Sequence, residues 1–271
     1  MTADRNTTWI RDKHATLFHF NEELRKLVES KWQRMNLESS AVKGVVSFAL
    51  GKGHKTHEAV LLLCERGFGQ DAAMLVRTLF ELAVTVAYIK KENSEYRAKR
   101  FLNYDWIIRK RMYDYAINHE EYKSLLTEAA PEGGIEELMR TANEMQKEYK
   151  YDRRFGWSDK SIRGMAGDVN LLSIYDTVYG LHSNLVHSAP RTANDYVSSP
   201  DMQEFTVQTG QSEKWVEESL VTAFHFYGIL VDHWQDTFSV DIKNEFEKLT
   251  KDYVEAVGKL HNRSESSVRV E

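Results

Sequence analysis

Two polar stripes interrupt segments that are otherwise apolar, and they hold the side chains of this chain best suited to chemistry. The first consists of Arg77, Glu81, Thr85 and Tyr88, whose spacing places them on one face of a helix. An ionisable side chain among core residues is costly unless it is paired or belongs to a site. An ion pair between Arg77 and Glu81 inside the core and a water-filled cleft both explain this stripe, and the sequence leaves the two open.

The second stripe occurs much later in the chain, and its intervals of three and four residues again describe one helical face. Its histidine, His187, lies one turn before Pro190. A histidine in that position often satisfies a helix C-terminus, whereas a histidine among other polar groups is typical of a general acid or base. Both interpretations of His187 stay open. The stripe consists of Asp176, Tyr179, Ser183 and His187, with His182 and Asn184 in the same two turns.

Both stripes lie in segments that resemble an uncharacterised bacterial helical family. That family pairs an L-V-R-x-x-x-E helix with a downstream S-x-x-V-H helix end. This chain has DAAMLVRTLFE at 71–81 and SNLVHS at 183–188, and the similarity runs from roughly Val60 to Ala193. The resemblance implies a helical fold and brings no assigned activity.

The stretch from His182 to His187 is also distantly similar to the signature of HEPN proteins. These are all-helical domains, many of them metal-independent ribonucleases of toxin and phage-defence systems. Their motif is an arginine, usually followed by a polar residue, and then a histidine, but here His182 occupies the position of the arginine. The resemblance implies that His187 acts as general acid and base, with Arg77 supplying the missing cation from the other helix. Glu81 would orient Arg77, and Ser183 would add a hydrogen bond.

A basic and aromatic segment over 96–111 is suited to following a phosphate backbone and stacking bases. A solvated helix face explains the same residues without any ligand. The residues that we expect to contact substrate are Arg97, Arg100, Tyr104, Arg111, His182 and Asp176.

Three possible metal ligands lie within one helical turn, at His54, His57 and Glu58. The spacing lacks the i,i+4 histidines and central glutamate of zincins, so surface histidines are the simpler explanation. We therefore expect no metal and no cofactor.

Three functions follow from these patterns. The first is a HEPN-like bacterial defence or stress protein that acts on RNA or binds nucleotide phosphate. The second is a non-enzymatic helical interaction module in which the polar stripes form buried networks. The third is a metal-dependent hydrolase that uses His54, His57 and either His182 or His187.

Composition limits the class of protein. The 271 residues are 42% hydrophobic and have a formal net charge of −5, which suits one large core and argues against broad attraction to nucleic acid. With a single cysteine, Cys64, and no apolar leader, we expect a reducing, cytoplasmic location. We expect no membrane span, because Arg77 and Glu81 interrupt the longest apolar run at 72–89. A homodimer is expected from the aromatic residues near 222–234.

Helical periodicity recurs along almost the whole chain. It predicts an all-α, single-domain bundle of about eight to ten helices over 1–262, a frayed tail at 263–271 and one short hairpin near 196–210. Helices over 70–91 and 169–188 should lie side by side at the centre, and Asp168 should cap the second. Gly51 and Gly53 should separate two helices. The other predicted helices are 14–33, 41–50, 55–66, 94–118, 135–150, 212–238 and 241–261.

Overall fold

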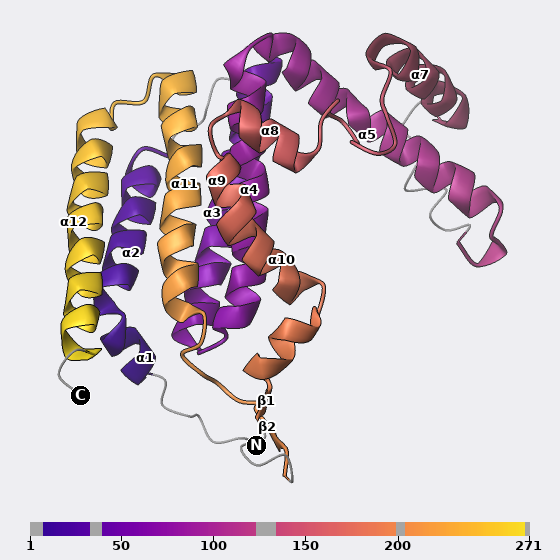
Figure 1. Cartoon of the computed structure of the whole chain (residues 1–271). Coiled ribbons are helices and arrows are strands. Elements are labelled where there is room, and N and C mark those ends of the chain that lie inside the picture. The colour runs from indigo at the N-terminus through magenta and orange to yellow at the C-terminus, as the bar shows by residue number, and fades with distance from the viewer. Residues whose placement is uncertain (1–7, 33–39, 123–133, 199–203, 269–271) are drawn as a thin grey trace.

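The computed structural model describes residues 8–32, 40–122, 134–198 and 204–268, and this part of the chain is almost entirely helical (Figure 1). The predicted all-α, multi-helix class is confirmed. The α-helices are α1 (Thr8–Lys13), α2 (Ala15–Ser30), α3 (Ala41–Glu65), α4 (Gly69–Lys91), α5 (Ser94–Ile117), α7 (Gly134–Tyr149), α8 (Ile162–Asp168), α9 (Leu172–Ile174), α10 (Gly180–Val186), α11 (Val216–Phe238) and α12 (Lys243–Val268). Shorter segments are the 3-10 turns η1 (Glu120–Tyr122) and η3 (Pro190–Asp195) and the π-helical turn η2 (Tyr175–Tyr179).

The core lies between α3, α4 and α11, with α2 and α12 covering one side (Figure 1). α4 is apolar around most of its circumference, so its side chains contact several neighbours at once. Leu79 and Phe80 are fully buried, and the Phe80 ring meets the ring of Phe226 from α11 edge to face. Burial of each such side chain stabilises the fold by about 1.5–3 kcal/mol.

Of the described helices, α4 alone is long and apolar enough to cross a membrane, by length and composition. In this structure, 67% of its most apolar window is buried inside the protein. The contacts that α4 makes with α3 and α11 therefore account for its apolar character.

α4 and α11 are neighbours that run in the same direction. At their first turns the backbones nearly touch, since a Cβ on Gly69 would come within 2.2 Å of the carbonyl oxygen of Lys214. At their last turns Lys90 Nζ donates to Asp236 at 2.5 Å and to Thr237 Oγ1 at 2.8 Å. The chain between the two helices must therefore travel back along the bundle before α11 begins.

The predicted break at Gly51 and Gly53 is wrong, because α3 is continuous through both residues. A Cβ at Gly53 would lie 2.4 Å from Leu230 Cδ1 of α11. This glycine therefore permits close helix packing and does not end a helix.

The helix predicted over 169–188 is present but shorter, from Leu172 to Val186, and its middle is π-helical. α8 ends at Asp168, so this residue is not the N-cap, and α9, η2 and α10 follow as one irregular helical path. The π-helical turn η2 inserts extra backbone between α9 and α10, and such turns often occur at functional sites. The path still packs along α4, as expected from the sequence.

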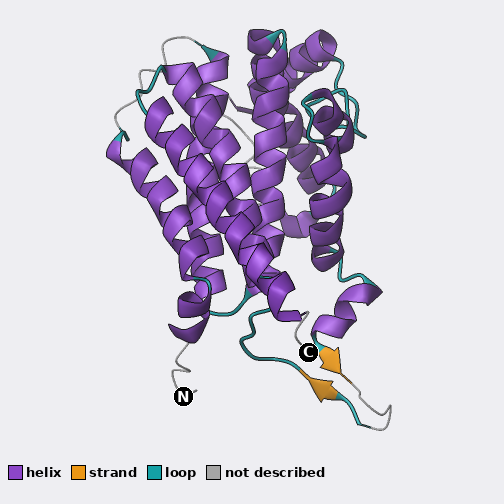
Figure 2. Ribbon diagram, turned by 60° about the vertical axis from the view of Figure 1, so that its left-hand side comes forward, coloured by secondary structure: helices purple, strands orange, loops and turns teal. Residues whose placement is uncertain are grey.

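Two peripheral structures project from the bundle. The second half of α5 extends away from it and is accompanied by α7 (Figure 1). At the other end, β1 (Val197–Ser198) and β2 (Thr206–Val207) pair antiparallel in a small exposed hairpin (Figure 2), as predicted for 196–210. α12 continues to Val268, through most of the segment predicted to fray, and residues 269–271 lie outside the described part of the chain.

Candidate functional site

Arg77 of α4 lies against two residues of the returning path. Its Nη1 atom is 3.4 Å from Nε2 of His187, and its Nη2 donates a hydrogen bond of 2.7 Å to the Tyr179 hydroxyl. The guanidinium carbon also lies 4.7 Å from the centre of the Tyr179 ring. Arg77 and His187 therefore lie in contact, although neither of them lines the cavity that adjoins Glu81.

Tyr179 and Glu81 complete the network around the guanidinium. The Tyr179 hydroxyl donates to Glu81 Oε1 at 2.9 Å, and the same oxygen lies 3.2 Å from Arg77 Nε, without the alignment of a hydrogen bond. Burial, together with the hydrogen bond to Glu81, raises the pKa of Tyr179 to about 12. The phenol is therefore protonated at neutral pH and donates to the carboxylate.

The network opens to solvent on one side. The Arg77 side chain is 20% exposed and the Glu81 side chain 40%, and His187 is exposed at the C-terminal end of α10. This differs from the dry, closed ion pair that was one of the two explanations of the first stripe. It also leaves His187 accessible to a large substrate.

The contact with Arg77 fixes which tautomer of neutral His187 fits best. A guanidinium only donates, so Nε2 must be the accepting nitrogen, and the ring proton then resides on Nδ1. At 3.4 Å the contact is longer than a typical hydrogen bond, so an anion can replace it at low cost. The backbone N–H of His187 donates to the carbonyl of Ser183 at 3.1 Å.

The remaining members of the second stripe do not meet Arg77. Asp176 forms a two-pronged ion pair with Arg163, with both distances 3.0 Å. His182 is 2% exposed and packs edge to face on Trp215, so it is not accessible as a substrate contact. Burial lowers the pKa of His182 to about 4.

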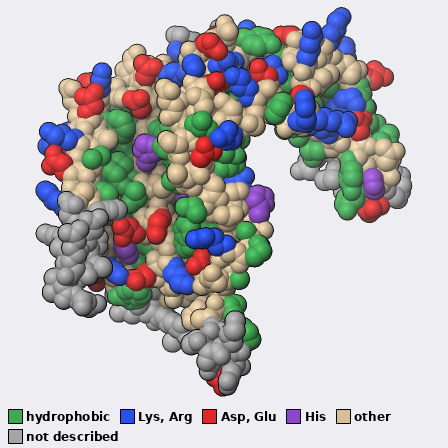
Figure 3. Space-filling view, viewed as in Figure 1, with side chains coloured by type: hydrophobic (Ala, Val, Ile, Leu, Met, Phe, Trp, Pro, Cys, Tyr) green, Lys and Arg blue, Asp and Glu red, His purple; other side chains and the backbone are tan. Residues whose placement is uncertain are grey.

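The basic residues predicted to bind substrate from α5 have local partners. Arg97 donates to the Tyr88 carbonyl and to Glu92, and Arg111 donates to the Tyr104 hydroxyl at 2.8 Å. Arg100 Nε donates to the carbonyl of Trp157 at 2.7 Å, which ties α5 to the loop before α8. Figure 3 shows many further Lys and Arg side chains over the α5 and α7 projection.

A cavity of about 470 Å³ adjoins the Arg77 network, with Glu81 in its wall. It continues along the first polar stripe to Thr85, and beyond it the Tyr88 hydroxyl donates to Asp159 at 2.9 Å. Its other walls come from α3, α5, α8 and the loop over 150–161. The sequence indicated the polar stripe but gave no sign of this cavity, because its walls are far apart along the chain.

The histidines of the predicted metal motif have other partners. His57 is fully buried, and its Nε2 lies 2.7 Å from the Asn21 side-chain oxygen. His54 Nδ1 lies 2.6 Å from the Tyr227 hydroxyl, and its Nε2 lies 3.0 Å from Arg25 Nη2. Across the described ranges, His, Cys, Asp and Glu side chains form no group of three able to hold a metal ion.

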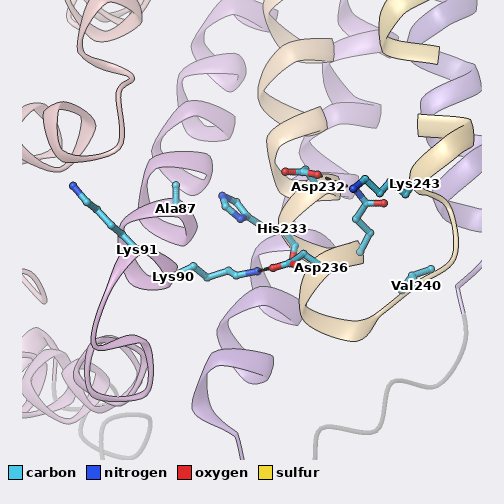
Figure 4. A pocket seen from close by; sticks show the side chains of 9 residues that line it. Ala87, Lys90, Lys91, Asp232, His233, Asp236, Val240 and Lys243 are labelled. Carbon is cyan, nitrogen blue, oxygen red and sulfur yellow. Dashed lines mark hydrogen bonds and ion pairs between the residues drawn. The ribbon is translucent and has the colours of Figure 1, made fainter. Parts of the chain in front are cut away.

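A second cavity, of about 460 Å³, lies between the last turns of α4 and α11 (Figure 4). His233 and several lysines line it, but Lys90 already donates to Asp236, to Thr237 and to the carbonyl of His233. We interpret these hydrogen bonds as structural contacts that hold the last turns of α4 and α11 together.

Comparison with known proteins places this all-α chain, with its Arg-Tyr-Glu-His network, in a family. The chain belongs to DUF5677, a family of unknown function whose model matches residues 43–205. The matched region contains both Arg77 and His187. Neither the search of curated proteins nor that of solved structures found a match.

Proposed function

We propose that this protein cleaves RNA without a metal ion, at the open site formed by Arg77 and His187. The observation that supports this most is the 3.4 Å contact between Arg77 and an exposed His187. A cation that stabilises charge beside a group that transfers protons is what phosphodiester cleavage needs. A site at the surface also suits a polymer better than a small molecule.

The proposed reaction uses the RNA 2′-hydroxyl as nucleophile. Phosphate binding to Arg77 replaces its long contact with His187 and frees the Nε2 lone pair. Nε2 takes the 2′-hydroxyl proton as the 2′-oxygen attacks phosphorus, and the resulting imidazolium gives that proton to the leaving 5′-oxygen. The products are a 2′,3′-cyclic phosphate and a 5′-hydroxyl. Tyr179 and Glu81 hold the guanidinium in place while it stabilises the pentavalent phosphorus.

The HEPN resemblance extends the proposal to a bacterial defence or stress role in the cytoplasm. The proposal also includes a homodimer, which sedimentation of the purified protein would test.

Cleavage of RNA in the presence of EDTA tests the activity. His187→Ala should lower the rate by roughly two to four orders of magnitude while the melting temperature is retained, since a positioned acid and base contributes about that much. His19→Ala, which removes an exposed histidine of α2, is the matched control and should cleave at the wild-type rate. Cleavage that EDTA abolishes would favour the metal-dependent hydrolase.

A non-enzymatic interaction module is the second candidate. It is supported by the pairing of Arg77 with Glu81 and Tyr179, which already balances the guanidinium charge. Under this alternative the protein cleaves no RNA and binds no phosphate ligand, and variants of the network change only stability.

A further inference from the structure

Aromatic rings from three separate segments line the cavity beside Glu81. They are Phe48 of α3, Phe101 of α5, and Phe155 and Trp157 of the loop before α8. The volume of about 470 Å³ lies within the range of roughly 300–1,000 Å³ that is common for small-molecule sites. The cavity is therefore large enough for a planar ring system with part of its sugar.

The rings are arranged so that one of them stays uncovered. Trp157 meets Phe101 edge to face at 5.2 Å between ring centres, and Phe101 lies 6.1 Å from Phe48 at a tilt of 42°. Phe101 and Trp157 thus support each other, whereas Phe48 is 47% exposed. A base that stacks on Phe48 would cover this apolar surface.

Polar groups around the rings suit the other parts of a nucleotide. Lys52, Arg154 and Lys160 supply positive charge, and the hydroxyls of Thr78 and Thr85 belong to the α4 wall. Lys160 and Arg154 pair with Asp168 and Asp152, respectively. Lys52 makes no ion pair with any residue that the structure describes, and its Nζ lies 6.0 Å from the centre of the Phe48 ring. A cation in that position is available to a phosphate.

The cavity and the Arg77 network share Glu81. Its carboxylate contacts Arg77 Nε at 3.2 Å and also lines the cavity wall. Arg77 and Glu81 are one helical turn apart, which corresponds to about 6 Å along α4. A phosphate at Arg77 and a base in the cavity can therefore belong to the same nucleotide or to adjacent ones.

We propose that this cavity binds a nucleobase of the RNA strand whose phosphate reaches Arg77 and His187, with Phe48 as the stacking surface. The choice of RNA rests on the proposed function. The proposed stacking of a base rests instead on the aromatic side chains that line the cavity.

Binding of a short labelled oligouridylate tests this inference. It is measured in the His187→Ala background so that cleavage is slow compared with binding, and it is compared with a ribose-phosphate chain of equal length without bases. Phe48→Ala should weaken oligouridylate binding about tenfold, which is the size expected for one stacked base, and should leave binding of the abasic chain unchanged. Phe48→Tyr keeps the ring and should bind oligouridylate like the parent.

The matched control is Phe205→Ala, because Phe205 is 71% exposed and does not line the cavity. Equal affinity for the two chains, or equal effects of Phe48→Ala and Phe205→Ala, would overturn the inference. Cleavage of RNA with base-independent binding would refute only the base site. Phe48-dependent binding without any cleavage would support the base site and refute the proposed activity.

Discussion

Arg77 uses each of its three nitrogens on a different partner. Nε faces Glu81, Nη1 faces His187, and Nη2 donates to Tyr179. A guanidinium carries five N–H donors, so these contacts fix its position and still leave donors for a phosphate. The side chain is thus held in place before any ligand binds, which lowers the entropic cost of binding one.

Loss of the Glu81 carboxylate should have a moderate effect on stability. Glu81→Ala removes an ion pair and a hydrogen-bond acceptor from side chains that are 20% and 40% exposed, so we expect a loss of about 1–2 kcal/mol in the free energy of unfolding. Urea unfolding measures it. A loss of about 3–5 kcal/mol would instead mean that Arg77 is left as an uncompensated buried charge.

The control for this measurement is Glu247→Ala. Glu247 also forms an i,i+4 pair, with Lys243 at 3.9 Å, but both side chains are more than half exposed. This variant should change the free energy of unfolding by only a few tenths of a kcal/mol.

Arg77, Glu81 and His187 stood out in the sequence because they belong to polar stripes in apolar segments, and the resemblance to helical families suggested that the two stripes work together. The sequence did not assign a role to Tyr179, although Tyr179 lies on the same stripe as His187. A phenol near a helix surface packs in many ways, and only the neighbouring helix shows that its hydroxyl bridges Arg77 and Glu81.

At the scale of elements, the π-helical turn η2 decides which members of the second stripe reach α4. Regular helical spacing would place Asp176 and Tyr179 on one face, but the extra backbone in η2 changes the register between α9 and α10. Asp176 pairs with Arg163, whereas Tyr179 and His187 face Arg77. Nothing in the residue types of 175–179 signals this change of register, because such turns depend on tertiary packing.

Deletion of one residue from α10 tests the importance of this register. Removal of the exposed Leu181, which lies in regular α-helix, should rotate the residues after it by about 100° relative to Tyr179 and turn His187 away from Arg77. Cleavage should then fall to the level of His187→Ala while the helical circular dichroism is kept. Leu181→Ala keeps the register and should cleave normally, and full activity of the deletion variant would show that the register does not matter.

At the scale of the whole molecule, burial makes the fold sensitive to acid. Burial lowers the pKa of several histidines below the usual 6.5, and for His182 to about 4. The unfolded chain therefore binds more protons than the folded chain between these values, so the free energy of unfolding falls as the pH falls below about 6.5. The histidines concerned are His14, His54, His57, His182, His225 and His233.

Urea unfolding at pH 7 and pH 5 measures this loss. His182 alone should account for about 2 kcal/mol of the loss in the free energy of unfolding at pH 5. His182→Leu removes the titrating ring from its packing against Trp215 and should reduce the loss by that amount. His19→Leu, at an exposed position, should lose as much stability as the wild type. An acid loss unchanged by His182→Leu would contradict this assignment.

The fold class was predictable because hydrophobic periodicity reports directly on buried helix faces. The connections were less predictable. Gly53 suggested a helix break, and only the proximity of Leu230 shows that it serves helix packing. The same limit applies to the cavity beside Glu81, because its walls meet only after four helices and a loop have packed.

The parallel arrangement of α4 and α11 has a consequence for where the length of this chain can change. α4 has 23 residues, so the connection to α11 must cover about 35 Å in the reverse direction. The path through α8, η2 and α10 covers that distance, and any shortening would detach α11 from its place in the core. The α5 and α7 projection spans no such distance, so changes of chain length should be tolerated there. His187 therefore lies on a segment whose minimum length is set by the position of α11.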